Sequence, residues 1–251
     1  MITNNLRKTV ASLGEAKHRR ELGLFKAEGA KCVTDTLSHF DLEYLFATDR
    51  FLSVHENFRR FPQTEQATRA DLDRMSSLST PTDVIAVYRI PQYELDIPSL
   101  SGNLSLALDS IQDPGNLGTI MRTADWFGVR DILCSQSTVD LFNPKTVQAT
   151  MGAISRVRVH YCDLPSVLSE AAKSGLPLYG TFLEGVNIYH ADLRQTGIIV
   201  MGNEGRGVSP EVASLLSNKL FIPPYGAGET SESLNVAIAT AVTLAEFRRR
   251  Q

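Results

Sequence analysis

The sequence predicts an α/β protein with a mainly parallel sheet in its C-terminal part and a smaller α/β domain in front of it. After residue 103, short apolar runs alternate regularly with helical stretches, which is typical of a parallel sheet. Residues 1–90 mix helix-like stretches with apolar runs less regularly, and residues 90–103 are rich in Pro, Ser and Gly, as linkers are. We therefore predict an N-terminal domain over residues 1–95 and a C-terminal domain over residues 103–251.

The elements of the C-terminal part follow from apolar runs and helical spacing. The expected strands are Leu104–Leu108, Asp131–Cys134, Val157–Tyr161, Leu178–Phe182, Ile198–Met201 and Leu220–Ile222. The expected helices are Leu117–Phe127, Pro144–Ala153, Leu164–Ser174, Pro210–Ser217 and, last, Ser233–Arg249. In the last helix, apolar residues recur at helical spacing and form a stripe: Leu234, Ile238, Ala241, Val242 and Ala245.

Composition excludes several classes of protein. A chain of 251 residues that is 43% hydrophobic can bury a sizeable core, and its charge of -3 excludes a globally basic nucleic-acid coat. No apolar stretch is long enough to span a bilayer, and the first residues lack the apolar run of a signal peptide. The cysteines Cys32, Cys134 and Cys162 match neither a disulfide framework nor a metal site, so we expect a cytoplasmic protein without a metal.

Positive charge gathers near the N-terminus. The first 31 residues hold seven Lys and Arg against three acids, and Arg19, Arg20 and Lys26 belong to this group. Two interpretations stay open: a solvated helix face, or a patch that contacts phosphates of a nucleic acid.

Three segments that follow predicted strands carry the candidate chemistry. In the first, a strand ends near Asp109, and a turn leads to Asn116, which we expect to cap the following helix, with Arg122 inside that helix. Ligands of open parallel sheets gather beyond the carboxyl ends of the strands, where such turns lie. The alternative is an ordinary strand–turn–helix corner with an exposed arginine.

The second segment runs from an apolar strand into a glycine-rich loop. Gly202, Gly205 and Gly207 fall within six residues, so the backbone could approach a ligand closely, and Glu204 could orient it. The spacing is not the G-x-G-x-x-G of a dinucleotide site, and the sequence contains no G-x-x-x-x-G-K-[ST] phosphate loop. A plain tight turn is the alternative.

The third segment leads from a strand through Pro223-Pro224 to the last helix. Ser233 is the expected N-cap, and Asn235 falls in the expected first turn, where its amide could face a ligand. A capped helix without a binding role is the alternative.

Taken together, the three segments resemble the three motifs of the SpoU (TrmH) family. The motifs read N-x-G-x-x-x-R-T-A, then G-N-E-G-x-G, then I-P followed by S-L-N-V, and the match spans residues 104–250. That family consists of RNA ribose 2′-O-methyltransferases of the AdoMet-dependent SPOUT class. In addition, Phe25–Gly29 after Arg19-Arg20 resembles a small RNA-binding domain that is similar to certain ribosomal proteins.

The resemblance implies an α/β-knot fold, in which the C-terminal segment forms a deep trefoil knot, and a homodimer whose sites are completed by the partner subunit. It implies AdoMet as methyl donor, no metal, and Arg122 next to the reacting 2′-hydroxyl, whose pKa its charge would lower. The implied catalytic residues are Arg122, Asn116, Glu204, Ser233 and Asn235. The implied cofactor-binding residues are Thr181, Gly202, Ile222 and Leu234, and the implied RNA-binding residues are Arg19, Arg20 and Lys26.

The sequence departs from the family in its third motif, where six residues separate Gly226 from Ser233 instead of about three. We therefore expect AdoMet-dependent 2′-O-methylation of a ribose in RNA, with ribosomal RNA favoured by the N-terminal domain. The alternatives are a tRNA ribose methyltransferase and a non-catalytic RNA-binding protein on the same scaffold. A small-molecule or protein methyltransferase agrees less well with the basic N-terminal segment.

Overall fold

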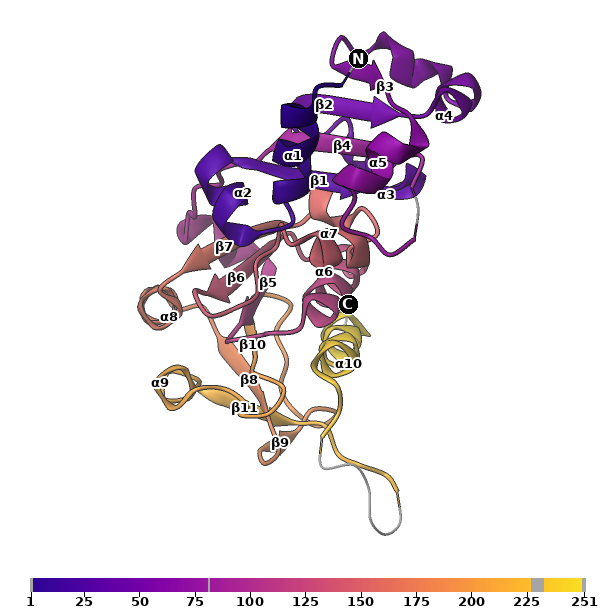
Figure 1. The fold of residues 1–251 in the computed structure, drawn as a ribbon. Helices are drawn as coiled ribbons and strands as arrows, with labels where there is room; N and C mark the ends of the chain where they lie inside the picture. Colours follow the sequence, from indigo (N-terminus) through magenta and orange to yellow (C-terminus); the bar gives the residue numbers. More distant parts are fainter. Residues whose placement is uncertain (1, 81, 227–232, 250–251) are drawn as a thin grey trace. The chain divides into compact units, whose positions relative to one another are not determined.

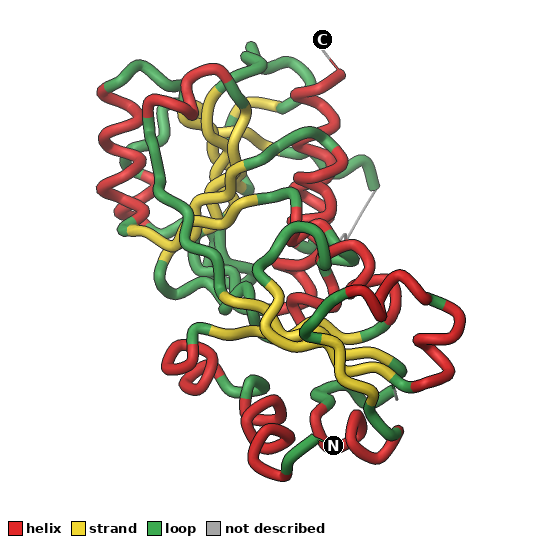
Figure 2. Tube along the Cα trace, turned by 90° about the horizontal axis from the view of Figure 1, so that it is seen from above, coloured by secondary structure: helices red, strands yellow, loops and turns green. Residues whose placement is uncertain are grey.

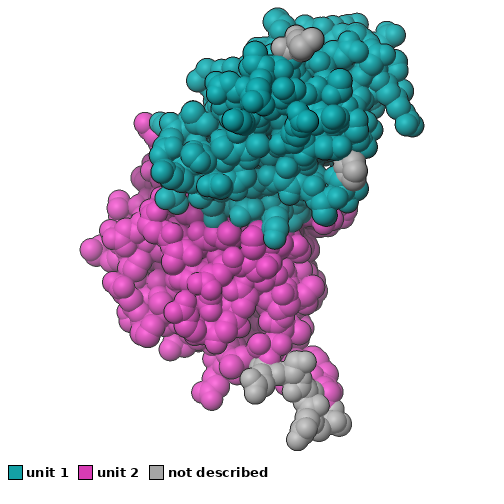
Figure 3. All heavy atoms as spheres, viewed as in Figure 1, with its two compact units in different colours: residues 1–92, 140–155 teal, residues 93–139, 156–251 magenta. Residues whose placement is uncertain are grey.

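A computed structural model describes residues 2–80, 82–226 and 233–249 of the chain. It divides into two compact units, coloured separately in Figure 3. Unit 1 comprises residues 1–92 and 140–155, and unit 2 comprises residues 93–139 and 156–251. Among the described residues, no helix is both long and apolar enough to cross a membrane.

Unit 1 is built on a four-stranded sheet in the order β1-β4-β2-β3. The strands are β1 (Leu24–Glu28), β2 (Leu42–Ala47), β3 (Thr64–Gln66) and β4 (Val84–Arg89). The central strand β4 is antiparallel to both neighbours, whereas β3 is parallel to β2. The helical elements are α1 (Asn4–Ser12), α2 (Ala16–Leu22), α3 (Ala30–Thr36), α4 (Asp49–Val54), η1 (Glu56–Arg60), α5 (Arg69–Met75), α7 (Pro144–Ala149) and η3 (Ala153–Ser155) (Figure 1).

Residues 140–155 belong to unit 1, although the predicted boundaries assigned them to the second domain. The physical reason is that residues 140–155 supply contact partners to buried residues of unit 1. The Nε atom of buried Arg19 donates to Asp140 Oδ2 at 3.1 Å. The ring of Phe142 lies 4.6 Å from that of Phe25 on β1. A buried guanidinium is costly unless a carboxylate pairs with its charge, and residues 140–155 bring Asp140 to Arg19.

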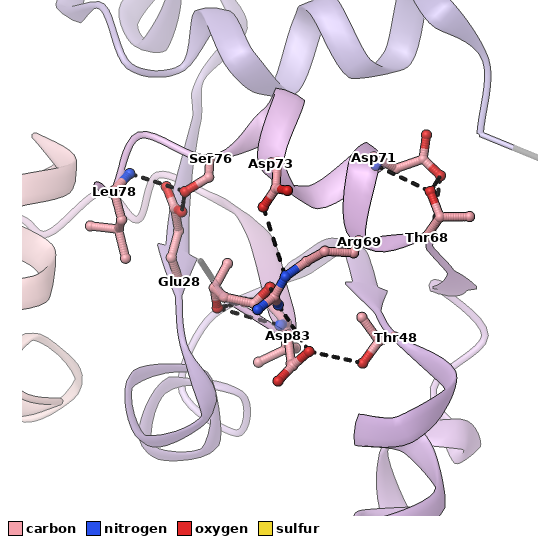
Figure 4. A network of polar contacts seen from close by, with 11 residues as sticks. Glu28, Thr48, Thr68, Arg69, Asp71, Asp73, Ser76, Leu78 and Asp83 are labelled. Carbon is pink, nitrogen blue, oxygen red and sulfur yellow. Dashed lines mark hydrogen bonds and ion pairs between the residues drawn. The ribbon is translucent and has the colours of Figure 1, made fainter. Parts of the chain in front are cut away.

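Strand β1 contains a buried ion pair. Lys26 and Glu28 lie two residues apart, so their side chains share one face of the strand, and Lys26 Nζ lies 3.3 Å from Glu28 Oε1. Nζ also donates to the carbonyl of Met75, and the carboxylate of Glu28 accepts from the Ser77 amide. Glu28 accepts from the Ser76 hydroxyl as well (Figure 4). Burial lowers the pKa of Lys26, and attraction to Glu28 opposes this. The pair therefore ties β1 to the end of α5.

A second polar network fixes the start of α5. Thr68 caps this helix in a capping box with Asp71. The next residue, Arg69, binds the carboxylate of Asp83 at 2.9 Å, and Asp83 also accepts from the hydroxyl of Thr48 at 3.2 Å (Figure 4). These contacts join α5, the start of α4 and the residue before β4.

Unit 2 contains a seven-stranded sheet in the order β7-β6-β5-β10-β8-β11-β9, and every pairing in it is parallel. The strands are β5 (Leu104–Leu108), β6 (Asp131–Ser135), β7 (Arg158–Cys162), β8 (Leu178–Phe182), β9 (Val186–Asn187), β10 (Gly197–Met201) and β11 (Asn218–Phe221). This confirms the predicted α/β class with its parallel sheet. The threading of the knot stays a prediction.

Helices cover both faces of this sheet (Figure 2). They are η2 (Pro98–Gly102), α6 (Pro114–Trp126), α8 (Leu164–Lys173), α9 (Pro210–Ala213) and α10 (Val236–Arg249). Leu168 of α8 and Val212 of α9 pack with Leu178 in one apolar cluster. On the opposite face, Phe247 of α10 packs edge-on against Tyr179, the next residue of β8, at 4.9 Å.

The buried pair in β1 yields a stability prediction. Lys26→Met leaves the carboxylate of Glu28 buried without its cation, which we expect to lower the free energy of unfolding by about 3–5 kcal/mol. The matched control is Lys31→Met, because Lys31 is exposed and its ion pair with Asp35 lies at the surface, so a loss of ~1 kcal/mol or less is expected. Urea unfolding at pH 7 measures both, and equal losses would contradict the importance of the buried pair.

Candidate active site

The first two motif segments start at the same level of the sheet. Strands β5 and β10 are paired in parallel with Leu108 opposite Met201. The next residues, Asp109 and Gly202, therefore leave the sheet side by side, and the amide of Asp109 donates to the carbonyl of Met201 at 2.9 Å. This is the carboxyl edge of the sheet, where parallel sheets bind ligands.

Side chains from all three segments join in one hydrogen-bonded cluster of Asn116, Glu204 and Asn235, which we call the amide–carboxylate cluster. Asn116 Nδ2 donates to Glu204 Oε1 at 2.9 Å, and Asn235 Nδ2 donates to Asn116 Oδ1 at 3.0 Å. Because each amide has one donor end and one acceptor end, these two bonds fix the orientation of the Asn116 side chain. Three of the five predicted catalytic residues are thus brought together.

The helix starts differ from those predicted, and the difference explains how the cluster forms. Helix α6 is capped by Asp113, whose carboxylate accepts from the amide of Asn116, and Pro114 occupies its first position. Asn116 therefore lies inside the first turn, with its own side chain free for Glu204. At α10 the side chain of Asn235 accepts from the amides of Ala237 and Ile238, so Asn235 rather than Ser233 is the cap.

The glycine loop, residues 202–207, closes on itself. Asn203 and Gly207 exchange two backbone hydrogen bonds of 2.9 Å. A Cβ atom at Gly202 would lie 2.3 Å from the backbone of Gly207 and Val208, a distance that real contacts do not show. The close approach of the two ends of the loop therefore requires glycine at position 202.

Arg122 lies on the exposed surface of α6, outside the cluster. It follows Asn116 by six residues, which places it roughly 9 Å further along the helix axis. Within the part of the chain that the structure describes, its guanidinium has no hydrogen bond or ion pair. The exposed Ser233 likewise has no side-chain partner among the described residues. Both groups are available to a ligand.

Three of the four predicted cofactor-binding residues follow or end neighbouring strands. Thr181 is the second-to-last residue of β8, and its hydroxyl contacts Met201 Sδ at 3.6 Å. Gly202 directly follows β10, and Ile222 directly follows β11. Strands β10, β8 and β11 are adjacent in the sheet, so these residues lie along one stretch of its carboxyl edge. The fourth, Leu234, is exposed just before α10. Backbone groups at such an edge suit a nucleoside ligand such as AdoMet.

Helices α6 and α10 lie side by side (Figure 1). Asn235 meets Asn116 near their starts, and Arg248 Nε donates to the carbonyl of Phe127 at 2.9 Å near their ends, so the two helices run parallel. The predicted apolar stripe of α10 points outward: Leu234 is 50% and Ile238 52% exposed. On α6, Trp126 is 85% exposed and lies one turn after Arg122. We call Arg122, Trp126, Leu234 and Ile238 the outer face.

Comparison with known proteins decides the family. Residues 103–245 match the SpoU rRNA Methylase family, and residues 4–86 match the MRM3-like substrate binding domain. The chain belongs to the SpoU family. The 23S rRNA (guanosine(2553)-2′-O)-methyltransferase RlmP of Bacillus subtilis is 28% identical over 92% of this chain and 91% of that protein.

Solved structures agree with this assignment. A member of the TrmH family from Porphyromonas gingivalis has a TM-score of 0.89 at 38% identity, and the match covers 100% of both chains. An AdoMet-bound rRNA methyltransferase from Sinorhizobium meliloti has a TM-score of 0.84 at 29% identity, covering 100% of this chain and 96% of that one. The predicted family and the predicted class of enzyme, an AdoMet-dependent RNA methyltransferase, are confirmed.

Two of the three predicted RNA-binding residues are buried in unit 1 and do not present their charge to solvent. Arg19 is 2% exposed and donates to Asp140 and to the carbonyls of Leu13 and Gly14. Lys26 is buried against Glu28. The prediction that these two cations contact RNA phosphates directly is therefore wrong. Arg20 is exposed, and no described residue pairs with it.

Asp109, Ser110 and Asn203 organise the site without belonging to the cluster, and they were not among the predicted site residues. The carboxylate of buried Asp109 accepts from the amide of Ser209 at 2.8 Å, and Asn203 Nδ2 donates to the carbonyl of Ser110 at 2.7 Å. Their position directly after buried strands was the available signal.

Residues 227–232, which hold the longer spacing of the third motif, lie outside the described residues. Among the described residues, no group of three metal-ligating side chains occurs.

The closed glycine loop yields a binding prediction. In Gly202→Ala, the new methyl group forces the loop apart, and we expect the Kd for AdoMet to rise about tenfold or more, equivalent to ~1.4 kcal/mol. Gly205→Ala is the control in the same loop, because its Cβ would meet only Asn203 Oδ1, at 3.8 Å. Titration calorimetry measures both. If Gly202→Ala bound AdoMet as tightly as Gly205→Ala, the loop would not form part of the cofactor site.

Proposed function

We propose that this SpoU-family chain methylates a ribose 2′-hydroxyl of ribosomal RNA, with AdoMet as methyl donor. The observation that carries the proposal is the amide–carboxylate cluster, in which one residue from each of the three motifs is held by hydrogen bonds. Ribosomal RNA is favoured because the matched family and the Bacillus subtilis relative are both named for it. Transfer RNA is the competing substrate, and the assay below separates the two.

The reaction sets two physical tasks for the protein. A ribose hydroxyl keeps its proton at neutral pH and is a weak nucleophile, so the proton must be accepted as the oxygen attacks. The oxygen must also be aligned with the bond that breaks, because displacement at carbon is in line. When bound, AdoMet supplies a methyl group on a sulfonium that is already a good leaving group.

Arg122 fits the electrostatic task. A guanidinium stays charged in proteins, so it is a poor proton acceptor but a strong partner for a phosphate and for a developing alkoxide. With its donors free, Arg122 would bind the phosphate next to the target ribose and lower the pKa of the 2′-hydroxyl. An oxygen of that phosphate would then accept the proton.

The amide–carboxylate cluster fits the alignment task. Asn116 is held by Glu204 on one side and Asn235 on the other, so its position does not change when substrate arrives. We infer that Asn116 and Glu204 shape the pocket for the ribose and that Ser233 donates its free hydroxyl to the substrate. Thr181, Gly202, Ile222 and Leu234 would hold AdoMet along the adjacent strand ends.

We further propose that the chain acts as a homodimer and that each site is completed by the partner subunit. Exposed Leu234 and Ile238 lie one turn apart at the start of α10, and exposed Trp126 lies one turn after Arg122 at the end of α6. The two helices pack together, and large apolar side chains left exposed on them support an interface between proteins. A second copy on this face would bury them and carry Arg122 toward the other subunit's cluster.

The N-terminal domain, residues 1–95, is the proposed RNA substrate-binding domain, and residues 103–251, apart from residues 140–155 of unit 1, are the proposed methyltransferase domain. The match to the MRM3-like substrate binding domain supports this, and Arg20 is the cation of the predicted set that solvent can reach. We place the protein in the cytoplasm, since Cys32, Cys134 and Cys162 are all free thiols.

The central test is transfer of label from AdoMet to RNA. Purified protein with labelled AdoMet should methylate ribose in ribosomal RNA and leave tRNA unlabelled. Arg122→Ala should lower kcat by about 100-fold or more, because it removes the charge that stabilises the alkoxide. Its melting temperature should stay that of the wild type, since Arg122 has no partner to lose among the described residues. Full activity in Arg122→Ala would contradict the mechanism.

Outcomes without transfer distinguish the alternatives. No binding of AdoMet in calorimetry, together with tight RNA binding, would identify a non-catalytic RNA-binding protein. Label in tRNA alone would replace the proposed substrate.

Mixed dimers test whether the site is shared. When Arg122→Ala and Glu204→Ala subunits are combined, one of the two sites in each mixed dimer has both groups intact. Activity should then return to about a quarter of wild type, because half of the dimers are mixed. The control combines Asn116→Ala with Glu204→Ala, a pair that lies within one cluster and should restore nothing. If the first mixture also stayed inactive, Arg122 would act in its own subunit.

A further inference from the structure

Asn203 is more strongly held than any member of the amide–carboxylate cluster. Its Oδ1 accepts from the amides of Gly205 and Arg206 at 3.1 and 3.0 Å, which shapes the glycine loop. Its Nδ2 donates to the carbonyl of Ser110 at 2.7 Å and to Glu204 Oε2 at 3.4 Å. One side chain therefore joins the loop, the corner after β5 and the carboxylate of Glu204.

The corner that receives Asn203 is itself strained. Ser110 has a φ of 63°, in the left-handed region that side chains other than glycine rarely adopt. Strain of this kind persists only where surrounding contacts hold it, and it gathers at functional sites. Here the amide of Ser110 donates to the hydroxyl of Ser135 at 2.8 Å, and its own hydroxyl donates to Asp109 at 3.1 Å. The backbone turn directs the Ser110 carbonyl to Asn203.

Asp109 holds both ends of this arrangement. Its buried carboxylate accepts from the Ser110 hydroxyl with one oxygen and from the amide of Ser209 with the other, and Ser209 lies just beyond the glycine loop. The loop and the corner are thus fixed to one group. Asn203 lies between them and cannot shift without breaking several hydrogen bonds.

Glu204, by contrast, is exposed and depends on two amides for its orientation. Asn116 binds Oε1 and Asn203 binds Oε2. Without the second contact, rotation of the carboxylate would carry Oε1 away from Asn116 and release the amide that the proposed mechanism needs fixed. The longer 3.4 Å contact is the kind that tightens when substrate is bound.

We propose that Asn203 is a positioning residue for methyl transfer: its side-chain N–H holds the carboxylate of Glu204, and the Asp109–Ser110 corner holds Asn203 for this purpose. The inference rests on the proposed function and deepens it. It names a residue that acts through Glu204 rather than on substrate.

Asn203→Asp is the discriminating variant, because it has nearly the same shape. It keeps an acceptor for the amides of Gly205 and Arg206 and removes the N–H that reaches Ser110 and Glu204. We expect kcat to fall roughly tenfold or more, while KM for AdoMet and for RNA stays within about twofold. Asn103→Asp is the control, because it makes the same change of charge at an exposed position. Asn103 lies just before β5, at the end of that strand opposite to the Asp109–Ser110 corner.

A second measurement does not depend on activity. The side-chain amide of Asn116 donates to Glu204, so its NMR resonance reports where that carboxylate lies. In Asn203→Asp it should move to the position seen in Glu204→Ala, and in Asn103→Asp it should stay at the wild-type position. If wild-type protein transferred no methyl group, the proposed function would fail, and this resonance would still decide whether Asn203 holds Glu204.

The outcomes that overturn the proposal are distinct. Unchanged kcat together with an unchanged Asn116 resonance would make Asn203 a turn residue of the glycine loop. Loss of AdoMet affinity or of the folded state in Asn203→Asp would make it part of the loop scaffold. A fall in kcat with KM preserved and the resonance moved supports positioning.

Discussion

The parallel pairing of β5 with β10 is the constraint on which the site depends. The two strands are far apart in the sequence, yet their register sets Leu108 opposite Met201. The corner after β5 and the glycine loop after β10 therefore begin at one level, and Asp109 bonds across to the backbone after the loop. All five residues of each strand are buried, and a shift of one residue would move every side chain of one strand to the opposite covered face of the sheet, so packing on both faces fixes the register. The contact between Asn116 and Glu204 follows from backbone pairing.

The site contains two kinds of side chain: some are hydrogen-bonded to one another, and others have free donors. Asn116, Asn203, Glu204 and Asn235 are joined to one another by hydrogen bonds. Groups fixed in this way need no ordering when substrate arrives, which is the advantage of preorganisation. Arg122 and Ser233 have no such partners among the described residues. A cation whose donors are unused can give all of them to a phosphate.

Local patterns predicted the elements well, and the errors lie at helix ends. Helices α7 and α9 end at Ala149 and Ala213, four residues before the predicted ends, and two helix starts were misplaced where two caps competed. Strand Leu178–Phe182 was found at its bounds because turn residues delimit its apolar run. The meeting of the three segments also followed from the sequence, since parallel strands share one carboxyl edge. Asn116 was misassigned as a cap because Asp113-Pro114 three residues earlier is the stronger start signal, and only one cap is used. Asn235 took the place of Ser233 for the same reason.

What the sequence could not supply is the long-range partner of each group. The local charge count predicted that Arg19 is a surface cation. Its carboxylate partner, Asp140, lies 121 positions away in the sequence, in the segment 140–155 that belongs to unit 1. The apolar stripe of α10 is a similar case. Its period predicts a helix with one apolar face, and a core would be the usual cover for that face. Here α10 buries its other side, with Phe247 on Tyr179, and leaves Ile238 outside. Exposed apolar side chains of this kind are typical of interfaces between proteins, so the feature that the local pattern could not place is also the one that supports the proposed homodimer.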